Sequence, residues 1–107
     1  GDADTAGRYW NVVREVNEKR YEFAGRAKDG NDAAGYLAEH PELGLVRRMD
    51  ATQQALQKLR AAKAQVEMSP NLREPERTAR MDEIDARSKK IMEEFTAQAK
   101  MMKGGKQ

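Results

Sequence analysis

Cysteine is absent from this chain of 107 residues, and histidine and tryptophan each occur once. Without cysteine there can be no disulfide bond and no thiolate zinc site. The single histidine, His40, excludes the usual histidine-rich metal sites, although carboxylate sites remain open. No apolar run approaches the roughly 20 residues of a transmembrane helix, and no signal peptide is recognisable. The chain begins Gly-Asp-Ala-Asp without methionine, so we expect a processed fragment or a part of something longer.

Large apolar side chains are also few. The apolar fraction is 38%, and because 16 of these residues are alanine, only 25 large apolar side chains remain. This composition suits long helices that pack along narrow stripes better than a compact globule. We therefore expect the chain to need a partner, or a parent protein, to cover part of its surface.

Charge is nearly balanced, with 20 basic and 18 acidic side chains and a net charge of +2. Such a balance does not require a nucleic acid or a membrane as partner. The only asymmetry is a small basic tail, to which Lys100, Lys103 and Lys106 contribute.

Apolar residues recur at helical spacing in three long runs and one short run. The expected helices are 3–28, 32–39, 42–67 and 74–102. Between the first two, Gly30 supplies a left-handed C-terminal residue and Asn31 a cap. His40 ends the second helix because it precedes Pro41, and the prolines of "MSPNLREP" separate the last two.

These runs predict an all-α fold in one domain, residues 1–103, followed by a flexible tail, 104–107. The last two long helices should form an antiparallel hairpin, since a short linker joins them. The first helix should lie against this hairpin, with the short helix as a corner piece. The buried stripes are expected to hold Tyr9, Val13, Val16, Phe23, Ala27, Leu43, Val46, Met49, Leu56, Leu59, Val66, Met81, Ile84, Ser88, Ile91, Phe95, Gln98 and Met102.

No residue pattern predicts catalysis, a cofactor or a metal. His40 as a general base would need a nucleophile or a polarised water, so we interpret it as a corner residue. The acids Asp82, Glu83 and Asp85 would need to converge to bind a metal, whereas early in a helix acids are also favoured by the helix dipole.

Two sets of residues are candidates for binding. Exposed aromatic and methionine side chains would form a docking surface for a protein partner, or would otherwise belong to the core: these are Tyr9, Trp10, Met92, Met101 and Met102. Basic residues of the third helix would contact DNA phosphates, or would otherwise be a solvated face: these are Arg47, Arg48, Lys58, Arg60 and Lys63.

Three segments carry a resemblance to a known family: "YWNVVREVNEKRYEF", "DAAGYLAEHPEL" and "SPNLREPERTARMDEIDARSKKIMEEF". In this order they resemble a C-terminal helical domain of the large polyvalent proteins of phages and mobile elements, which also closes some internal virion (ejection) proteins. The resemblance covers about residues 8–96, and its most specific pieces are Tyr36-Leu37 with His40-Pro41-Glu42-Leu43, and the proline-rich break followed by Arg80, Ile84 and Asp85.

The resemblance implies a module of a giant protein that is packaged in the virion and delivered with DNA into the host. It carries no catalytic residue onto this chain, and likeness of fold does not establish activity. We expect a non-enzymatic structural and interaction module that packs against its parent chain, neighbouring virion subunits or a homo-oligomer partner. The alternatives are weak, non-specific DNA binding, and a hydrolase that depends on His40 or Asp85.

Overall fold

The computed structural model describes residues 2–28 and 32–104, and every regular element in these ranges is helical. The elements are α1 (Asp2–Lys28), α2 (Ala33–Glu39), the 3-10 helix η1 (Pro41–Leu45), α3 (Val46–Met68) and α4 (Glu74–Gly104). The predicted all-α fold and its four helical segments are confirmed. The expected roles of Gly30 and Asn31, and residues 105–107 of the expected tail, lie outside the described residues. Gly104, which was expected in the tail, is the last residue of α4.

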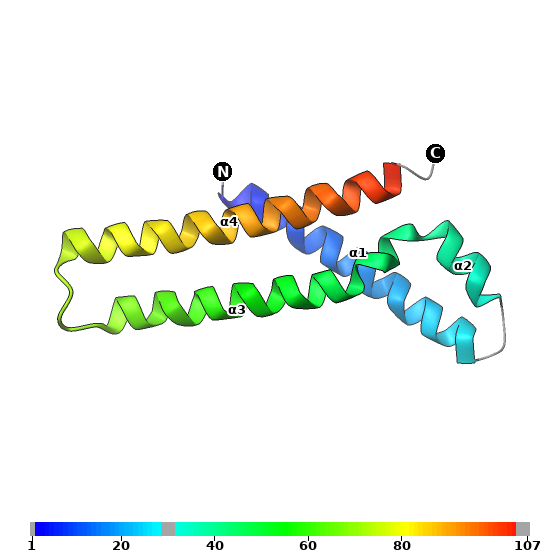
Figure 1. The fold of residues 1–107 in the computed structure, drawn as a ribbon, viewed down its shortest axis with the longest axis horizontal. Helices are drawn as coiled ribbons and strands as arrows, with labels where there is room; N and C mark the ends of the chain where they lie inside the picture. Colours follow the sequence, from blue (N-terminus) through cyan, green and yellow to red (C-terminus); the bar gives the residue numbers. More distant parts are fainter. Residues whose placement is uncertain (1, 29–31, 105–107) are drawn as a thin grey trace.

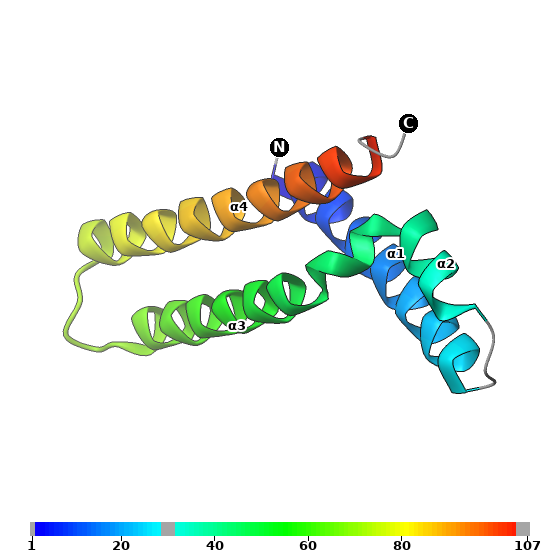
Figure 2. The same ribbon diagram turned by 45° about the vertical axis from the view of Figure 1, so that its right-hand side comes forward.

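The helices α3 and α4 form the predicted antiparallel hairpin, and α1 crosses α4 obliquely near the hairpin's open end (Figure 1). Turned by 45°, the same ribbon shows α2 beside the C-terminal half of α1, away from the hairpin tip (Figure 2). The molecule measures 59 × 28 × 16 Å, with a radius of gyration of 17.9 Å. A compact domain of this length would have a radius near 13 Å, so the chain is an elongated rod.

The turn between α2 and α3 differs from the prediction. Residues 41–45 form a 3-10 helix, whereas the sequence predicted that the third helix begins at residue 42. Pro41 begins this short helix, where its missing amide donor is not needed. The cap of α2 is Asp32, whose side chain accepts a hydrogen bond of 2.8 Å from the amide of Gly35.

The core lies where α1, η1 and the two long helices meet. Tyr9 and Phe95 are fully buried, and their rings meet edge to face with centroids 5.8 Å apart. The buried cluster comprises Tyr9, Val13, Val16, Leu45, Met49, Phe95 and Ala99. The predicted stripe of α1 is therefore right up to Val16, whereas Ala27 is exposed and Phe23 is half-buried beside Tyr36.

Burial stops abruptly along the hairpin. Thr52 is the last buried residue of α3, and Phe95 is the first buried residue of α4. Between them, in residues 53–94, every side chain is at least partly exposed. The apolar residues that join the two helices here are only half-buried, so this distal hairpin is two helices thick with open faces.

The tip of the hairpin is held by Arg77. Its guanidinium donates hydrogen bonds to the backbone oxygens of Ser69 and Leu72, at 2.8 and 2.9 Å, and pairs with Glu74. A side chain of α4 thereby holds the backbone of the linker that precedes this helix. The sequence pattern located the linker through its prolines but did not indicate this role of Arg77.

Candidate docking grooves

Two grooves run along the distal hairpin. We call the first the Trp10 groove; its volume is about 280 Å³. It is lined by Ala6, Trp10, Leu56, Leu59, Arg60, Lys63, Ile84, Asp85, Ser88 and Met92. Trp10 is 45% exposed. The first turns of α1 thus place a large, partly exposed aromatic ring beside the hairpin.

The second groove, the Arg87 groove, is wider and contains no residue of α1. Its volume is about 510 Å³, and it is lined by Ala55, Lys58, Leu59, Arg87, Lys90, Ile91 and Glu94. Lys58 here and Arg60 of the Trp10 groove point about 160° apart around α3 by the 3.6-residue period. The two grooves therefore lie on different faces of the hairpin, with Leu59 between them.

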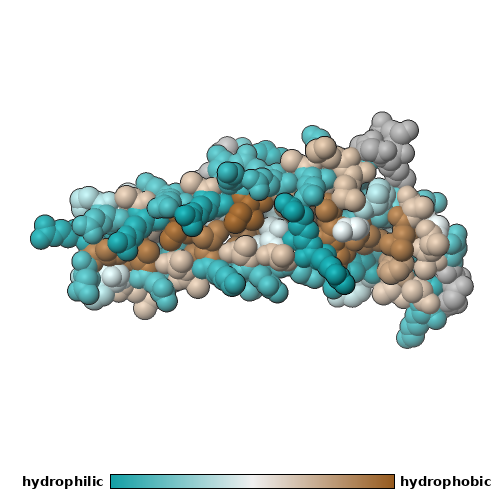
Figure 3. Space-filling model, viewed as in Figure 1, coloured by the Kyte–Doolittle hydropathy of each residue, from teal (hydrophilic) through white to brown (hydrophobic). Residues whose placement is uncertain are grey.

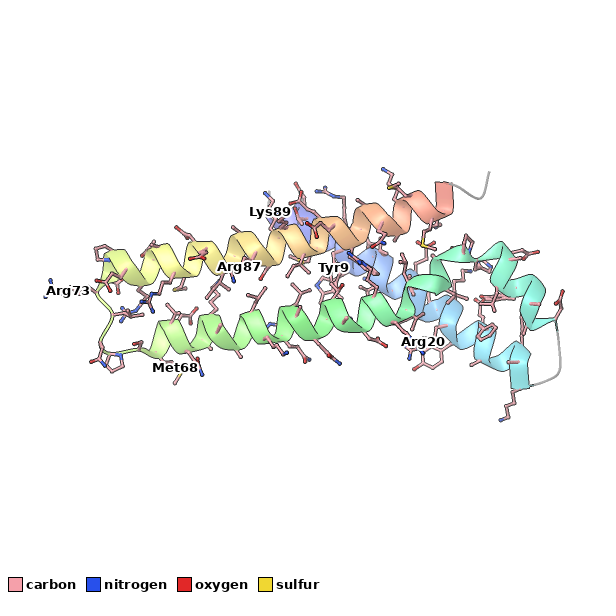
Figure 4. The ribbon with its side chains drawn as sticks, viewed as in Figure 1. Tyr9, Arg20, Met68, Arg73, Arg87 and Lys89 are labelled. Carbon is pink, nitrogen blue, oxygen red and sulfur yellow. The ribbon has the colours of Figure 1, made fainter. Side chains whose placement is uncertain are left out.

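An apolar seam follows the hairpin on the face turned to the reader in Figure 3, between rows of hydrophilic side chains. Arg87 projects from α4 toward α3 in the same view (Figure 4). Its side chain lies 3.3 Å from Glu83 in an i,i+4 ion pair, and both partners are about two-thirds exposed. An exposed pair of this kind contributes little stability, so Arg87 is available to a partner.

The residues predicted to bind a protein partner separate in the structure. Trp10 and Met92 meet in the Trp10 groove, and Met101 is 76% exposed near the end of α4. Met102 packs against the core cluster. Tyr9 is fully buried, so its ring supports Trp10 edge to face, with centroids 5.2 Å apart, and is not itself on the surface.

The basic residues predicted as the DNA-binding alternative do not form one surface. Lys58 lines the Arg87 groove, whereas Arg60 and Lys63 line the Trp10 groove. The Lys63 ammonium is 2.9 Å from Asp85 of α4, and the hydrogen bond to this carboxylate raises the pKa of Lys63. Arg47 and Arg48 are exposed near the start of α3.

The acidic cluster of α4 does not converge either. Asp85 turns to Lys63 across the hairpin, and Glu83 turns to Arg87 along the helix. Asp82 is exposed. Among residues 2–28 and 32–104, no group of three or more acidic or histidine side chains is arranged to hold a metal ion.

His40 occupies the corner that the sequence predicted. Its amide donates to the carbonyl of Tyr36 at 3.0 Å, and its carbonyl accepts from the amide of Leu43 at 3.1 Å. The residue therefore ends α2 and begins η1. Its ring Nδ1 lies 3.2 Å from an oxygen of Glu42, whose side chain is only 4% exposed.

The surroundings of His40 were not anticipated. A pocket of about 300 Å³ beside it is lined by Glu15, Lys19, Glu39, His40, Glu42 and Lys103. Lys103 of α4 pairs with Glu15 of α1, and this hydrogen bond raises the pKa of the lysine, which stays an ammonium. The sequence could not show this cluster because Glu15, Glu42 and Lys103 lie far apart along the chain.

The chemistry of this pocket is that of an electrostatic junction. Its lining offers carboxylates, ammonium groups and one imidazole, but no hydroxyl or thiol nucleophile for His40 to activate. Lys103 cannot serve as the nucleophile while it is protonated. Lys103 of α4 pairs with Glu15 of α1 and is attracted to Glu42 of η1, so opposite charges link α1 and the corner to α4.

A second polar contact fastens α2 to α1. The hydroxyl of Tyr36 donates a 2.6 Å hydrogen bond to Glu22, and the guanidinium of Arg26 lies 4.8 Å from the centre of the Tyr36 ring. Burial, and next the bond to Glu22, raise the pKa of Tyr36 to about 12. The bond to Tyr36 is the largest cause of a lowered pKa at Glu22.

No protein family, curated protein or solved structure matches the chain. In the ranges that the structure describes, none of the helices has a stretch apolar enough to span a bilayer.

Proposed function

We propose that this chain is a non-enzymatic, helical structural and interaction module of a large phage internal virion (ejection) or polyvalent protein. In this role it packs against its parent chain or neighbouring virion subunits during DNA delivery, and it resides in the virion until it is delivered into the host cell. The family resemblance of residues 8–96 supports the phage context, and the geometry of the hairpin supports the mode of action.

The observation that carries the proposal is the absence of any buried side chain in residues 53–94. A hairpin of this length gains stability chiefly by burying its apolar stripe, since intrinsic helix propensity contributes little. Here Leu59, Ile84 and Ile91 are only partly buried along two grooves, and so are Leu56 and Met92, which also pack against the core cluster. A helical partner laid along either groove would complete the burial.

Basic charge supports the DNA-binding alternative less well. The five basic residues of α3 point to different faces, and Lys63 is already neutralised by Asp85. Phosphate binding of any strength needs several cations on one surface, and it would weaken steeply as salt increases.

Hydrogen exchange tests the proposal. In the isolated chain we expect fast exchange of backbone amides in residues 53–94 and slow exchange around Tyr9, Met49 and Phe95. In the assembled parent protein or virion, exchange of the distal hairpin should slow by about tenfold or more, because a partner then covers it. A distal hairpin that is as well protected as the core in a monomeric chain would contradict the proposal.

A further inference from the structure

We infer that the Arg87 groove is a docking site for an acidic amphipathic helix. The apolar face of this partner lies on the floor of the groove, and its carboxylates pair with the cations along the edges. This inference rests on the proposed function, because it states the chemistry of the partner at one of the two open grooves. The charges, the apolar floor and the length of the groove support it.

The charges that line the groove are mostly positive. Its cations are Lys58, Arg87 and Lys90, its acid is Glu94, and all four side chains are exposed. In the described part of the chain, no side chain forms an ion pair with Lys58 or Lys90. Arg87 has an exposed pair with Glu83, which contributes little stability and can be replaced by a pair with a partner. The groove therefore offers three cations to an acidic partner.

These cations lie on both edges of the groove. Lys63 and Asp85 pair across the antiparallel hairpin, so each step back along α3 corresponds to a step forward along α4. Lys58 of α3 comes five residues before Lys63, and Lys90 of α4 comes five residues after Asp85. The two lysines are therefore about level with each other, one on each helix, and a helix laid between them would meet a cation on each flank.

The floor between these edges is apolar. It is formed by Ala55 and Leu59 of α3 and Ile91 of α4, which are all partly buried. Lys58 directly precedes Leu59, and Lys90 directly precedes Ile91, so each lysine points about 100° away from its apolar neighbour by the 3.6-residue period. An apolar floor between two lysines complements an amphipathic helix that carries acids on both flanks.

The groove is long enough for two turns of a partner helix. On α4 it extends from Arg87 to Glu94, which is about 10 Å at a rise of about 1.5 Å per residue. Helices that dock in grooves use apolar anchors at positions i, i+3 or i+4, and i+7, which cover the same length. No residue of α1 lines this groove, so α1 does not block a helix that lies in it.

A nucleic acid fits the groove less well. Its phosphates would pair with the exposed cations, but a phosphate backbone has no apolar face, so the floor would stay uncovered. Glu94 would also repel a phosphate. An amphipathic helix can satisfy both features, since it buries the floor and can place a basic or amide side chain opposite Glu94.

The Trp10 groove offers less positive charge. Its lining cations are Arg60 and Lys63, and Lys63 is already neutralised by Asp85. Arg60 is therefore its single unpaired cation among the described residues. The two grooves of one hairpin thus differ in charge, and the Trp10 groove provides a matched control for an acidic partner.

Three designed peptides test the inference on the 107-residue chain. Each is a fluorescein-labelled helix of about 18 residues, or five turns, with the same leucine face and no tryptophan. The positions that flank the leucines carry glutamate, glutamine or lysine. Fluorescence anisotropy should show that the glutamate peptide binds about tenfold or more tightly than the lysine peptide, with the glutamine peptide between them. Added salt should weaken binding of the glutamate peptide, because salt screens exposed ion pairs.

Charge reversal on the chain tests the edges of the groove. The double variant of Lys58→Glu with Lys90→Glu should reverse the order, so that the lysine peptide binds more tightly than the glutamate peptide. Arg60→Glu makes the same kind of change at an exposed position of the Trp10 groove. This control should leave the order of the three peptides unchanged.

Two further measurements locate the bound peptide. Ala55→Arg fills the floor and should abolish binding of the glutamate peptide with unchanged helical circular dichroism, although it adds a positive charge. Ala61→Arg adds the same charge at an exposed position outside both grooves and should leave binding intact. Trp10 is the only tryptophan of the chain and lines the other groove, so its emission should not change when the peptide binds.

Each other outcome overturns the inference. It fails when no peptide binds at millimolar concentration, when all three bind equally, or when binding shifts the emission of Trp10 and depends on Arg60. Duplex DNA that binds the unaltered chain, loses affinity in the double lysine variant and keeps it in Ala55→Arg would identify a phosphate-binding surface instead. The proposed function is judged separately: a distal hairpin whose amide exchange slows in the parent assembly keeps that function, even when no acidic peptide binds.

Discussion

Lys63 of α3 and Asp85 of α4 form an ion pair across the hairpin, with the Nζ and Oδ1 atoms 2.9 Å apart. This is the described ion pair that joins α3 to α4, and it lies in the distal half, where no side chain is buried. The pair therefore favours one register of two helices that otherwise meet here through partly buried apolar side chains. The register in turn positions both grooves.

The first prediction concerns this pair. Replacing Lys63 or Asp85 by alanine should lower the free energy of unfolding by about 0.2–1 kcal/mol, because both side chains are a third or more exposed and water screens them. A double-mutant cycle measured by urea denaturation isolates the coupling energy between them. The i,i+4 pair Glu83–Arg87 is the control, and its coupling should be about 0.3–0.5 kcal/mol. A zero coupling energy for Lys63 and Asp85 would contradict a role in setting the register.

The second prediction concerns the gradient of burial. Phe95→Ala should destabilise the fold by about 3–5 kcal/mol, since it leaves a cavity beside the fully buried Tyr9. Ile84→Ala, in the distal hairpin, should cost only about 1 kcal/mol, because a half-exposed side chain loses less transfer free energy. Both values come from urea denaturation of the isolated chain. Equal costs at the two positions would show that the distal hairpin is packed as tightly as the core.

A third prediction compares two tyrosine hydroxyl groups. The hydroxyl of Tyr9 is buried and has no hydrogen-bond partner among the described residues, and this burial raises the pKa of Tyr9. Tyr9→Phe removes an unsatisfied polar group and should stabilise the fold by about 1 kcal/mol. Tyr36→Phe removes the hydroxyl that donates to Glu22 and should destabilise it by a similar amount. Thermal denaturation of both variants would reveal the opposite signs.

The fourth prediction is a pH dependence. The pKa of Tyr36 is about 12 in the folded chain, whereas an unfolded tyrosine titrates near 10. A raised pKa means that the folded state holds its proton more tightly. The contribution to stability is therefore complete below about pH 10 and is lost as pH rises from about 10 to 12. Ultraviolet titration of tyrosinate absorbance should show this late ionisation. Tyr36→Phe should remove the Tyr36 part of it and leave that of Tyr9, whose pKa burial also raises.

The fifth prediction concerns the corner. His40→Ala leaves the Glu42 carboxylate, 4% exposed, without its imidazole partner. We expect this change to cost more stability than Glu42→Gln, because removing one partner of a buried pair leaves a charge that is poorly compensated. The free energy of unfolding of the two variants, measured at the same pH, decides the order. A larger loss for Glu42→Gln would show that Lys103, and not His40, is the main partner of Glu42.

Much of the fold could be predicted from the sequence, because helices depend on neighbours three and four residues apart. The boundaries of α1 and α4 lie within two residues of those expected, and the breaks before Pro41 and between Pro70 and Pro75 are where proline requires them. The 3-10 turn at residues 41–45 was missed, since it depends on how the corner meets the hairpin.

Only the tertiary structure decided which part of each apolar stripe is buried and which part stays exposed. The stripe of α4 keeps its helical spacing from Met81 to Met102, yet burial begins only at Phe95, where the buried face of α1 packs against the hairpin. The same packing buries Tyr9, whereas Trp10, its neighbour in sequence, stays partly exposed in a groove. Sequence periodicity determines which side of a helix is apolar, whereas the crossing of distant helices determines how much of that side is covered.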